Sequence, residues 1–193
     1  MKNTIKFLLF SFLLVSIGAC ASPKKKKSEK QQVNQDKPKQ KEQPKVSKDR
    51  FCNPGKDWKC DTSKMAFMGK GKTYIKTNKK GLPEATISIM ETKKDNPTLS
   101  LPLETLSEAG TCGIKLISSK FKVESKPRVF KIGKADAVIT IVSYKDKIAG
   151  DESKAAILYI RSAGIQYNLL FQTPLAYFDK NMPIFEKFYK SFK

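Results

Sequence analysis

The chain beyond residue 60 is a succession of short apolar runs, most of which alternate between apolar and polar residues. Such alternation is typical of strands with one buried face. The run 136–145 is almost continuously apolar, which indicates a central strand covered on both faces. Gly164 follows Ser162 and Ala163 between two runs and predicts a hairpin turn. We expect strands over 65–68, 73–77, 85–92, 114–124, 128–132, 136–145, 154–161 and 165–172.

Two further segments show helical signals. In the first, Ser100 is a candidate N-cap, Pro102 fits the first turn and Gly110 is a candidate stop. Leu103 and Leu106 would form its buried stripe. This pattern predicts a short helix between 100 and 110.

The second helix is expected at the C-terminus. Thr173 can cap it, with Pro174 at the first helical position, and Pro183 is a candidate break into two helices. Apolar residues recur there at spacings of three and four, which is typical of a helix face that packs in a core. They are Phe178, Met182, Phe185, Tyr189 and Phe192. The order of elements predicts an α+β fold, an antiparallel sheet of about six strands with helices packed on its faces.

The first 19 residues have the pattern of a secretory signal peptide. Lys2 and Lys6 precede an apolar run over 7–19, about 13 residues long, whereas a membrane-spanning helix needs about 20. Its end, Ile17-Gly18-Ala19-Cys20, resembles the lipobox of bacterial lipoproteins. The resemblance implies a thioether-linked lipid on Cys20, cleavage before it and acylation of the new N-terminus. The alternative is an ordinary cleaved signal with a chance cysteine.

The location follows from the same resemblance. A lipidated Cys20 places the protein in the bacterial cell envelope as a lipid-anchored protein. Ala21 follows Cys20, so there is no Asp retention signal, and the outer membrane is expected if the organism has two membranes.

Segment 20–50 is predicted to be a tether between the anchor and a single domain at 51–193. Residues 21–50 carry ten Lys and one Arg against four acids and almost no apolar residue, so this segment should be disordered. It either holds the domain off the membrane or acts as a basic arm that binds anionic lipid or an envelope polymer. Nucleic acid is not expected, because no aromatic residue offers bases a stacking platform. The lysines nearest the lipid are Lys24, Lys25, Lys26 and Lys27.

Three cysteines remain after Cys20. Cys52 and Cys60 flank a seven-residue segment with a Pro-Gly turn signal, and we expect them to form a disulfide, which leaves Cys112 reduced. Pairing through Cys112 is the alternative, since sequence does not fix connectivity. A metal site is not expected, because the chain has no His and no C-x-x-C pair. No cofactor is predicted.

The domain resembles the Mog1/PsbP-like superfamily. The resemblance rests on Pro54 and Trp58, on Gly133-Lys134-Ala135-Asp136-Ala137 before a strand, and on a strand ending Tyr167-x-Leu169-x-Phe171. It continues through Thr173-Pro174, Phe178, Pro183-x-Phe185 and Ser191-Phe192-Lys193. It implies an α/β/α sandwich and non-enzymatic roles in assembly or binding, and it supplies no catalytic residue.

Catalytic motifs are weak. Gly71-Lys72-Thr73 lacks the first glycine of a P-loop, and Ser119-x-x-Lys122 lacks the companion motifs of penicillin-binding enzymes. Without His no Ser-His-Asp triad can form. Acidic residues that could in principle pair are mostly at expected surface positions: Glu84, Glu91, Glu104, Glu108, Asp136 and Asp146.

These observations predict a non-enzymatic binding or assembly module, anchored by lipid at the cell envelope. The alternative is a surface-exposed lipoprotein that binds host molecules or other polyanions, which the net charge of +20 favours. An enzyme is the third hypothesis.

Overall fold

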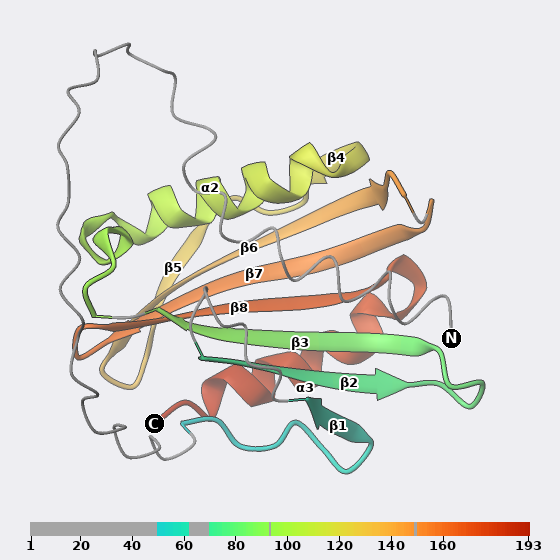
Figure 1. Ribbon diagram of the computed structural model, residues 1–193, viewed down its shortest axis with the longest axis horizontal. Coiled ribbons are helices and arrows are strands. Elements are labelled where there is room, and N and C mark those ends of the chain that lie inside the picture. The colour runs from blue at the N-terminus through green and yellow to red at the C-terminus, as the bar shows by residue number, and fades with distance from the viewer. Residues whose placement is uncertain (1–49, 62–69, 93, 149) are drawn as a thin grey trace, which may run out of the picture.

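The structure is a computed structural model, and it describes residues 50–61, 70–92, 94–148 and 150–193. The predicted signal peptide, Cys20, Lys24–Lys27 and the expected strand at 65–68 lie outside these residues. The described chain forms a sheet of eight strands in the order β1-β2-β3-β8-β7-β6-β4, with β5 also paired to β6 (Figure 1). All neighbouring strands are antiparallel.

The strands differ widely in length. The four adjacent strands β3, β8, β7 and β6 are the longest, with 10 to 12 residues each, and β-branched, aromatic and aliphatic residues make up most of their middle parts. The bounds are β1 Trp58–Asp61, β2 Lys70–Thr77, β3 Pro83–Thr92, β4 Ser118–Val123, β5 Arg128–Ile132, β6 Ala135–Asp146, β7 Glu152–Ser162 and β8 Ile165–Pro174.

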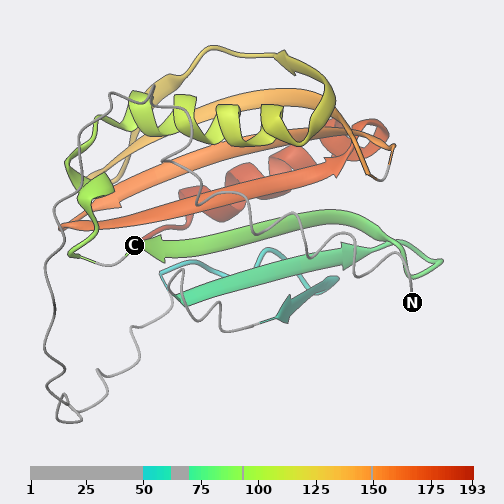
Figure 2. The same cartoon turned by 45° about the horizontal axis from the view of Figure 1, so that its top comes forward.

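Two α-helices lie on opposite faces of the sheet, α2 (Leu103–Leu116) on one and α3 (Phe178–Lys190) on the other (Figure 1 and Figure 2). Short 3-10 helices precede them, η2 (Pro97–Ser100) before α2 and η3 (Leu175–Tyr177) before α3. Each face therefore carries one helix and one core. We call these the α2-side core and the α3-side core.

The two cores differ in composition. The α2-side core is mainly aliphatic and includes Leu106, Val138 and Ile157. The α3-side core is rich in aromatic rings, and Phe171 stacks on Phe185 with ring centroids 4.8 Å apart. Alternate residues of β6 contribute to both cores, as expected for a strand covered on both faces. The predicted aromatic stripe of the C-terminal helix is buried in the α3-side core, except that Met182 is only partly buried.

The predicted α/β/α sandwich of about six strands is wrong. The described residues form an antiparallel sheet of eight strands with only two α-helices. β1 was not predicted, because its four residues Trp58–Asp61 are too few to show a period. The strand predicted over 114–124 is in fact the end of α2 followed by β4, because this continuous run does not show where the helix ends and the strand begins.

Both helix boundaries also differ from the prediction. Gly110 does not end α2. A Cβ at this position would lie 2.5 Å from Tyr159 Oη, so the glycine allows the helix to approach the sheet closely. At the C-terminus α3 begins at Phe178 instead of Pro174, and it continues through Pro183 without a break.

Candidate functional site

A shallow hollow lies over β4, β6 and β7, on the face that carries α3. Its volume is about 200 Å³. We call it the lysine hollow, and the residues that line it include Lys120, Lys122, Ser143, Lys145, Glu152 and Leu175.

Strand register brings these residues together. Lys120 of β4 is paired with Lys145 of β6, which is paired in turn with Glu152 of β7. Lys122 is paired with Ser143, two residues along. Directly paired residues share a face of an antiparallel sheet, so three lysines from two adjacent strands project from one side.

Two of these lysines lack a carboxylate partner. Lys122 Nζ lies 3.0 Å from Glu124 Oε2, but Lys120 and Lys145 form no ion pair with any described residue. Like charges directly opposite each other on adjacent strands are destabilising. The Lys120–Lys145 pair is therefore a local conflict within the sheet, which a bound anion would relieve.

Hydroxyl and acidic groups complete the hollow. Ser143 Oγ donates a hydrogen bond of 2.6 Å to Glu124 Oε1. This bond and the one from Lys122 hold the pKa of Glu124 below its usual value. Because Glu124 is already occupied by these two partners, Lys120 and Lys145 are the cations that remain available to a ligand.

Exposed apolar side chains lie around the hollow. Leu175, 47% exposed, forms part of its wall, and Ile148, 80% exposed, follows Lys145 in the β6–β7 hairpin. Lys147 ties this hairpin to the end of α2, because its Nζ donates to the carbonyl oxygen of Leu116 at 2.8 Å. Leu116 is itself 53% exposed. Cationic and apolar side chains thus occur together at this end of the domain.

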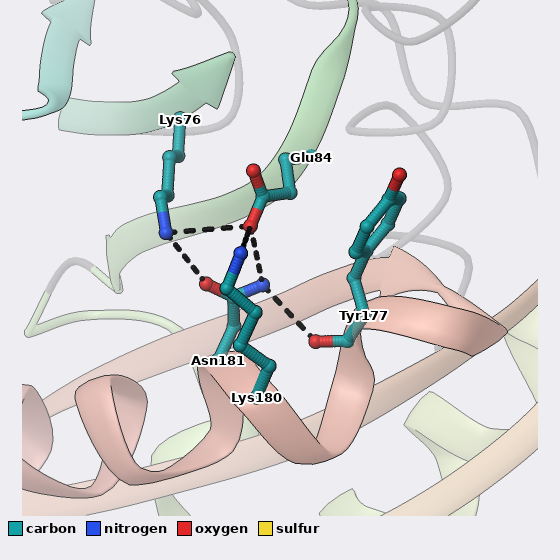
Figure 3. A network of polar contacts seen from close by, with 5 residues as sticks. All are labelled: Lys76, Glu84, Tyr177, Lys180 and Asn181. Carbon is teal, nitrogen blue, oxygen red and sulfur yellow. Dashed lines mark hydrogen bonds and ion pairs between the residues drawn. The ribbon is translucent and has the colours of Figure 1, made fainter. Parts of the chain in front are cut away.

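A second polar cluster joins α3 to β2 and β3, and we call it the Glu84 clamp (Figure 3). Glu84, only 7% exposed, accepts from Lys180 at 3.1 Å and lies 3.3 Å from Lys76 Nζ. Asn181, fully buried, donates from Nδ2 to Glu84 Oε1 and to the carbonyl oxygen of Tyr177. Its Oδ1 accepts from Lys76 at 3.1 Å.

The charges in the Glu84 clamp compensate one another. Burial alone raises the pKa of Glu84, but the hydrogen bonds from Lys180 and Asn181 and the charge of Lys76 outweigh it, so the net shift is downward. A carboxylate held ionised by three donors is a poor general base. We therefore assign the clamp a structural role.

A third polar row crosses the other face of the sheet. Arg161 donates to Gln166 Oε1 and to the carbonyl oxygen of Leu101, Gln166 donates to Asn168, and Asn168 donates to Thr92. Gln166 and Asn168 alternate with apolar residues in sequence, yet both are buried. The row fixes the segment before α2 to the sheet, which is again a structural role.

The other residues singled out from the sequence do not form a site. Gly71-Lys72-Thr73 lies inside β2 and Ser119 and Lys122 lie inside β4, where a strand replaces the loop or helix that those motifs require. Of the six acidic residues, only Glu84 is buried, and the structure does not pair it with another carboxylate. In the described part of the chain, no group of three or more His, Cys, Asp or Glu side chains could hold a metal ion.

The structure describes three of the four cysteines. Cys52 and Cys60 are exposed free thiols in the structure, which does not contain the bridge expected between them. That bridge stays a prediction. Cys112 lies on α2, whereas the backbone N–H of Cys52 donates to Ser191 Oγ at the end of α3. These helices cover opposite faces of the sheet. A bridge within one molecule from Cys112 to Cys52 is therefore disfavoured, because bridged Cα atoms lie within about 7 Å.

Comparison with known proteins gives distant likenesses only. No family model matches the chain, and no curated protein matches it in sequence. The resemblance to the Mog1/PsbP-like superfamily therefore stays an expectation. Among the described residues, no helix has the length and apolar character needed to cross a bilayer.

Two solved structures are similar in fold at low scores. One is a protein of unknown function from Pseudomonas aeruginosa, described as a putative regulator, with a TM-score of 0.49 and 12% identity over 66% of this chain and 79% of that one. The other is LpqN, involved in cell envelope biogenesis of Mycobacterium tuberculosis, with a TM-score of 0.45 and 15% identity over 69% of this chain and 73% of that one. Likenesses of this size carry no argument about function.

Proposed function

We propose that the protein is a lipid-anchored lipoprotein of the cell envelope whose domain is a non-enzymatic module that binds an anionic ligand in the lysine hollow. The anchor part rests on Ile17-Gly18-Ala19-Cys20 after the apolar run. The outer membrane is its expected location in an organism with two membranes.

The observation that carries the binding proposal is the direct pairing of Lys120 with Lys145 across β4 and β6. Proteins tolerate local conflicts of this kind mainly where function needs them. A phosphate or carboxylate between the two ammonium groups would turn repulsion into two charge-assisted contacts.

A binding role also fits the chemistry around the hollow. Its lining includes three lysines and Glu152, and Glu124 is hydrogen-bonded to the lining residues Ser143 and Lys122. Glu124 has its pKa lowered by the hydrogen bonds from Ser143 and Lys122, which suits a fixed anion and not a group that gives and takes protons near neutral pH.

The anchor is tested by substitution of its cysteine. Cys20→Ala should abolish palmitate labelling of the protein in growing cells and leave uncleaved or soluble material. A variant that is processed normally and still partitions wholly into detergent would show that the lipobox interpretation is wrong.

The binding site is tested with unlipidated protein, residues 21–193, and a fluorescent glycerol phosphate oligomer as the probe. The double variant Lys120→Gln/Lys145→Gln should bind about 30-fold more weakly, since each lysine near an anionic surface contributes about 1 kcal/mol. The matched control is Lys134→Gln/Lys187→Gln, which removes the same charge from exposed positions away from the hollow. Equal weakening in both variants would mean that net charge, and not the hollow, determines binding.

A further inference from the structure

Exposed apolar side chains concentrate at one end of the domain. Of the six large apolar side chains that are exposed in the described residues, four lie in the loops and helix ends at this end. Leu82 is in the β2–β3 hairpin, Leu116 ends α2, Ile148 is in the β6–β7 hairpin and Leu175 follows β8. Figure 1 shows both hairpins and the end of α2 at the same end of the sheet, on the right.

Lysines accompany these apolar side chains. Lys79 and Lys80 precede Leu82, Lys115 precedes Leu116, and Lys145 and Lys147 precede Ile148. The lysine hollow opens at the same end, with Leu175 in its wall. Lysine side chains keep their charge in water while their stems cover apolar surface, which suits a boundary between a polar and an apolar phase.

We propose that this end of the domain docks onto the anionic lipid surface of a membrane. Ile148, Leu116, Leu175 and Leu82 enter the headgroup region, and the lysine hollow takes a lipid phosphate between Lys120 and Lys145. This inference rests on the proposed function and names its partner as an anionic phospholipid bilayer.

The distribution of the apolar residues favours a bilayer over a protein partner. They sit singly on four separate segments across the width of the sheet, and lysines separate them along the chain. The buried centre of a protein interface is typically one contiguous patch, depleted of lysine and enriched in aromatic residues. The exposed large apolar side chains of the described residues are Leu, Val and Ile only.

The length of the tether permits this orientation. The described chain begins at Arg50, whose carbonyl oxygen accepts from the backbone N–H of Lys193, and Figure 1 places that C-terminus at the opposite end of the sheet. The 12 residues of β6 span about 40 Å at roughly 3.3 Å per residue. A chain of the length of 21–49 can extend to about 100 Å. A chain of this length can therefore reach from the membrane to residue 50 even when the opposite end of the domain contacts the membrane.

The test is co-sedimentation of unlipidated 21–193 with phosphatidylcholine vesicles that contain or lack phosphatidylglycerol. Ile148→Gln/Leu116→Gln should weaken binding to the anionic vesicles about tenfold, since burial of such side chains is favourable. Lys120→Gln/Lys145→Gln should weaken it about 30-fold. The matched controls are Val129→Gln, 51% exposed on β5, and Lys134→Gln/Lys187→Gln, which should stay within about twofold of the wild type.

Two results separate this inference from the proposed function. If Ile148→Gln/Leu116→Gln binds anionic vesicles like the wild type while Lys120→Gln/Lys145→Gln loses both vesicles and the soluble oligomer, membrane docking is wrong and anion binding stands. If neither variant differs from its control with either probe, both fail. Selective loss of vesicle binding in the apolar variant, with oligomer binding retained, is the result that we expect.

Discussion

Two groups of lysines in this domain meet opposite environments. In the Glu84 clamp, Lys76 and Lys180 both contact one buried carboxylate, and Asn181 satisfies the remaining polar atoms. In the lysine hollow, Lys120 and Lys145 face each other from adjacent strands, and neither forms an ion pair with a described residue, although Glu152 lies opposite Lys145 in the register. Both groups lie on the face that carries α3.

This difference indicates that the lysines of the clamp serve stability and the lysines of the hollow serve binding. A buried charge without its partner costs several kcal/mol, so the components of the clamp depend on one another. The hollow lysines are solvated, so their conflict costs little and they remain available to an external anion. The clamp should therefore respond to mutation in stability and the hollow in ligand affinity.

The largest expected effect is on the clamp. Glu84→Gln leaves Lys76, whose side chain is 13% exposed, without a counter-charge, and should lower the free energy of unfolding by about 3 kcal/mol. Urea unfolding of 21–193 measures it. The matched control is Glu186→Gln, which breaks the exposed pair with Lys190 and should cost less than about 0.5 kcal/mol. Similar losses in both variants would remove the distinction between buried and exposed pairs.

The pH dependence of stability sharpens the same point. The pKa of Glu84 in the folded protein lies below its ordinary value of 4.5. The stabilisation linked to that carboxylate is therefore present above pH 4.5 and is lost as pH falls through the folded-state pKa. The stability difference between wild type and Glu84→Gln should shrink on acidification from pH 6 to about pH 3. A constant difference over this range would contradict the assignment.

Mutation of the hollow should change the free energy of unfolding in the opposite direction to mutation of the clamp. Lys120→Gln removes the like charge opposite Lys145 but keeps the Lys145–Glu152 pair of strands β6 and β7. We expect a gain in unfolding free energy of a few tenths of a kcal/mol, about 0.3. Thermal unfolding in low salt, with Lys134→Gln as the control for net charge, measures it. Destabilisation by about 1 kcal/mol or more would mean that Lys120 has a structural role.

The smallest effect is expected at the tether. Removal of residues 21–49 should shift the thermal midpoint by no more than about two degrees, because a segment so poor in apolar residues cannot bury enough surface to stabilise the domain. Arg50 and Phe51 are kept, since Phe51 stacks on Phe188 with centroids 5.3 Å apart. A loss of several degrees would show that the tether packs on the domain.

The sequence predicted the long elements well because their periods are local. Strands β6, β7 and β8 and the aromatic stripe of α3 each show enough residues for the period to emerge. β1 has four residues, and the end of α2 runs into β4 without a polar break, so these boundaries depend on tertiary packing. Gly110 was predicted to end the helix, because the sequence does not show that this position packs against Tyr159.

The candidate site was less accessible to sequence reasoning than the fold. Its lysines come from β4 and β6, about 25 positions apart, and only the register of the two strands makes Lys120 and Lys145 neighbours. The composition did show a strongly basic chain, but the lysines predicted to bind an anionic surface were Lys24–Lys27. The Glu84 clamp was missed for the same reason, because Glu84 and Asn181 are distant in sequence and look like ordinary surface residues.

The most direct test of the central claim maps the contact surface. Amide NMR spectra of unlipidated 21–193 would be recorded during titration with short-chain phosphatidylglycerol below its micelle concentration, with short-chain phosphatidylcholine as the control lipid. The account predicts shifts that depend on the anionic lipid and concentrate at Leu116, Lys120, Lys145, Ile148 and Leu175, and that largely disappear in Lys120→Gln/Lys145→Gln. Shifts that spare these positions, or that are equal for both lipids, would contradict it.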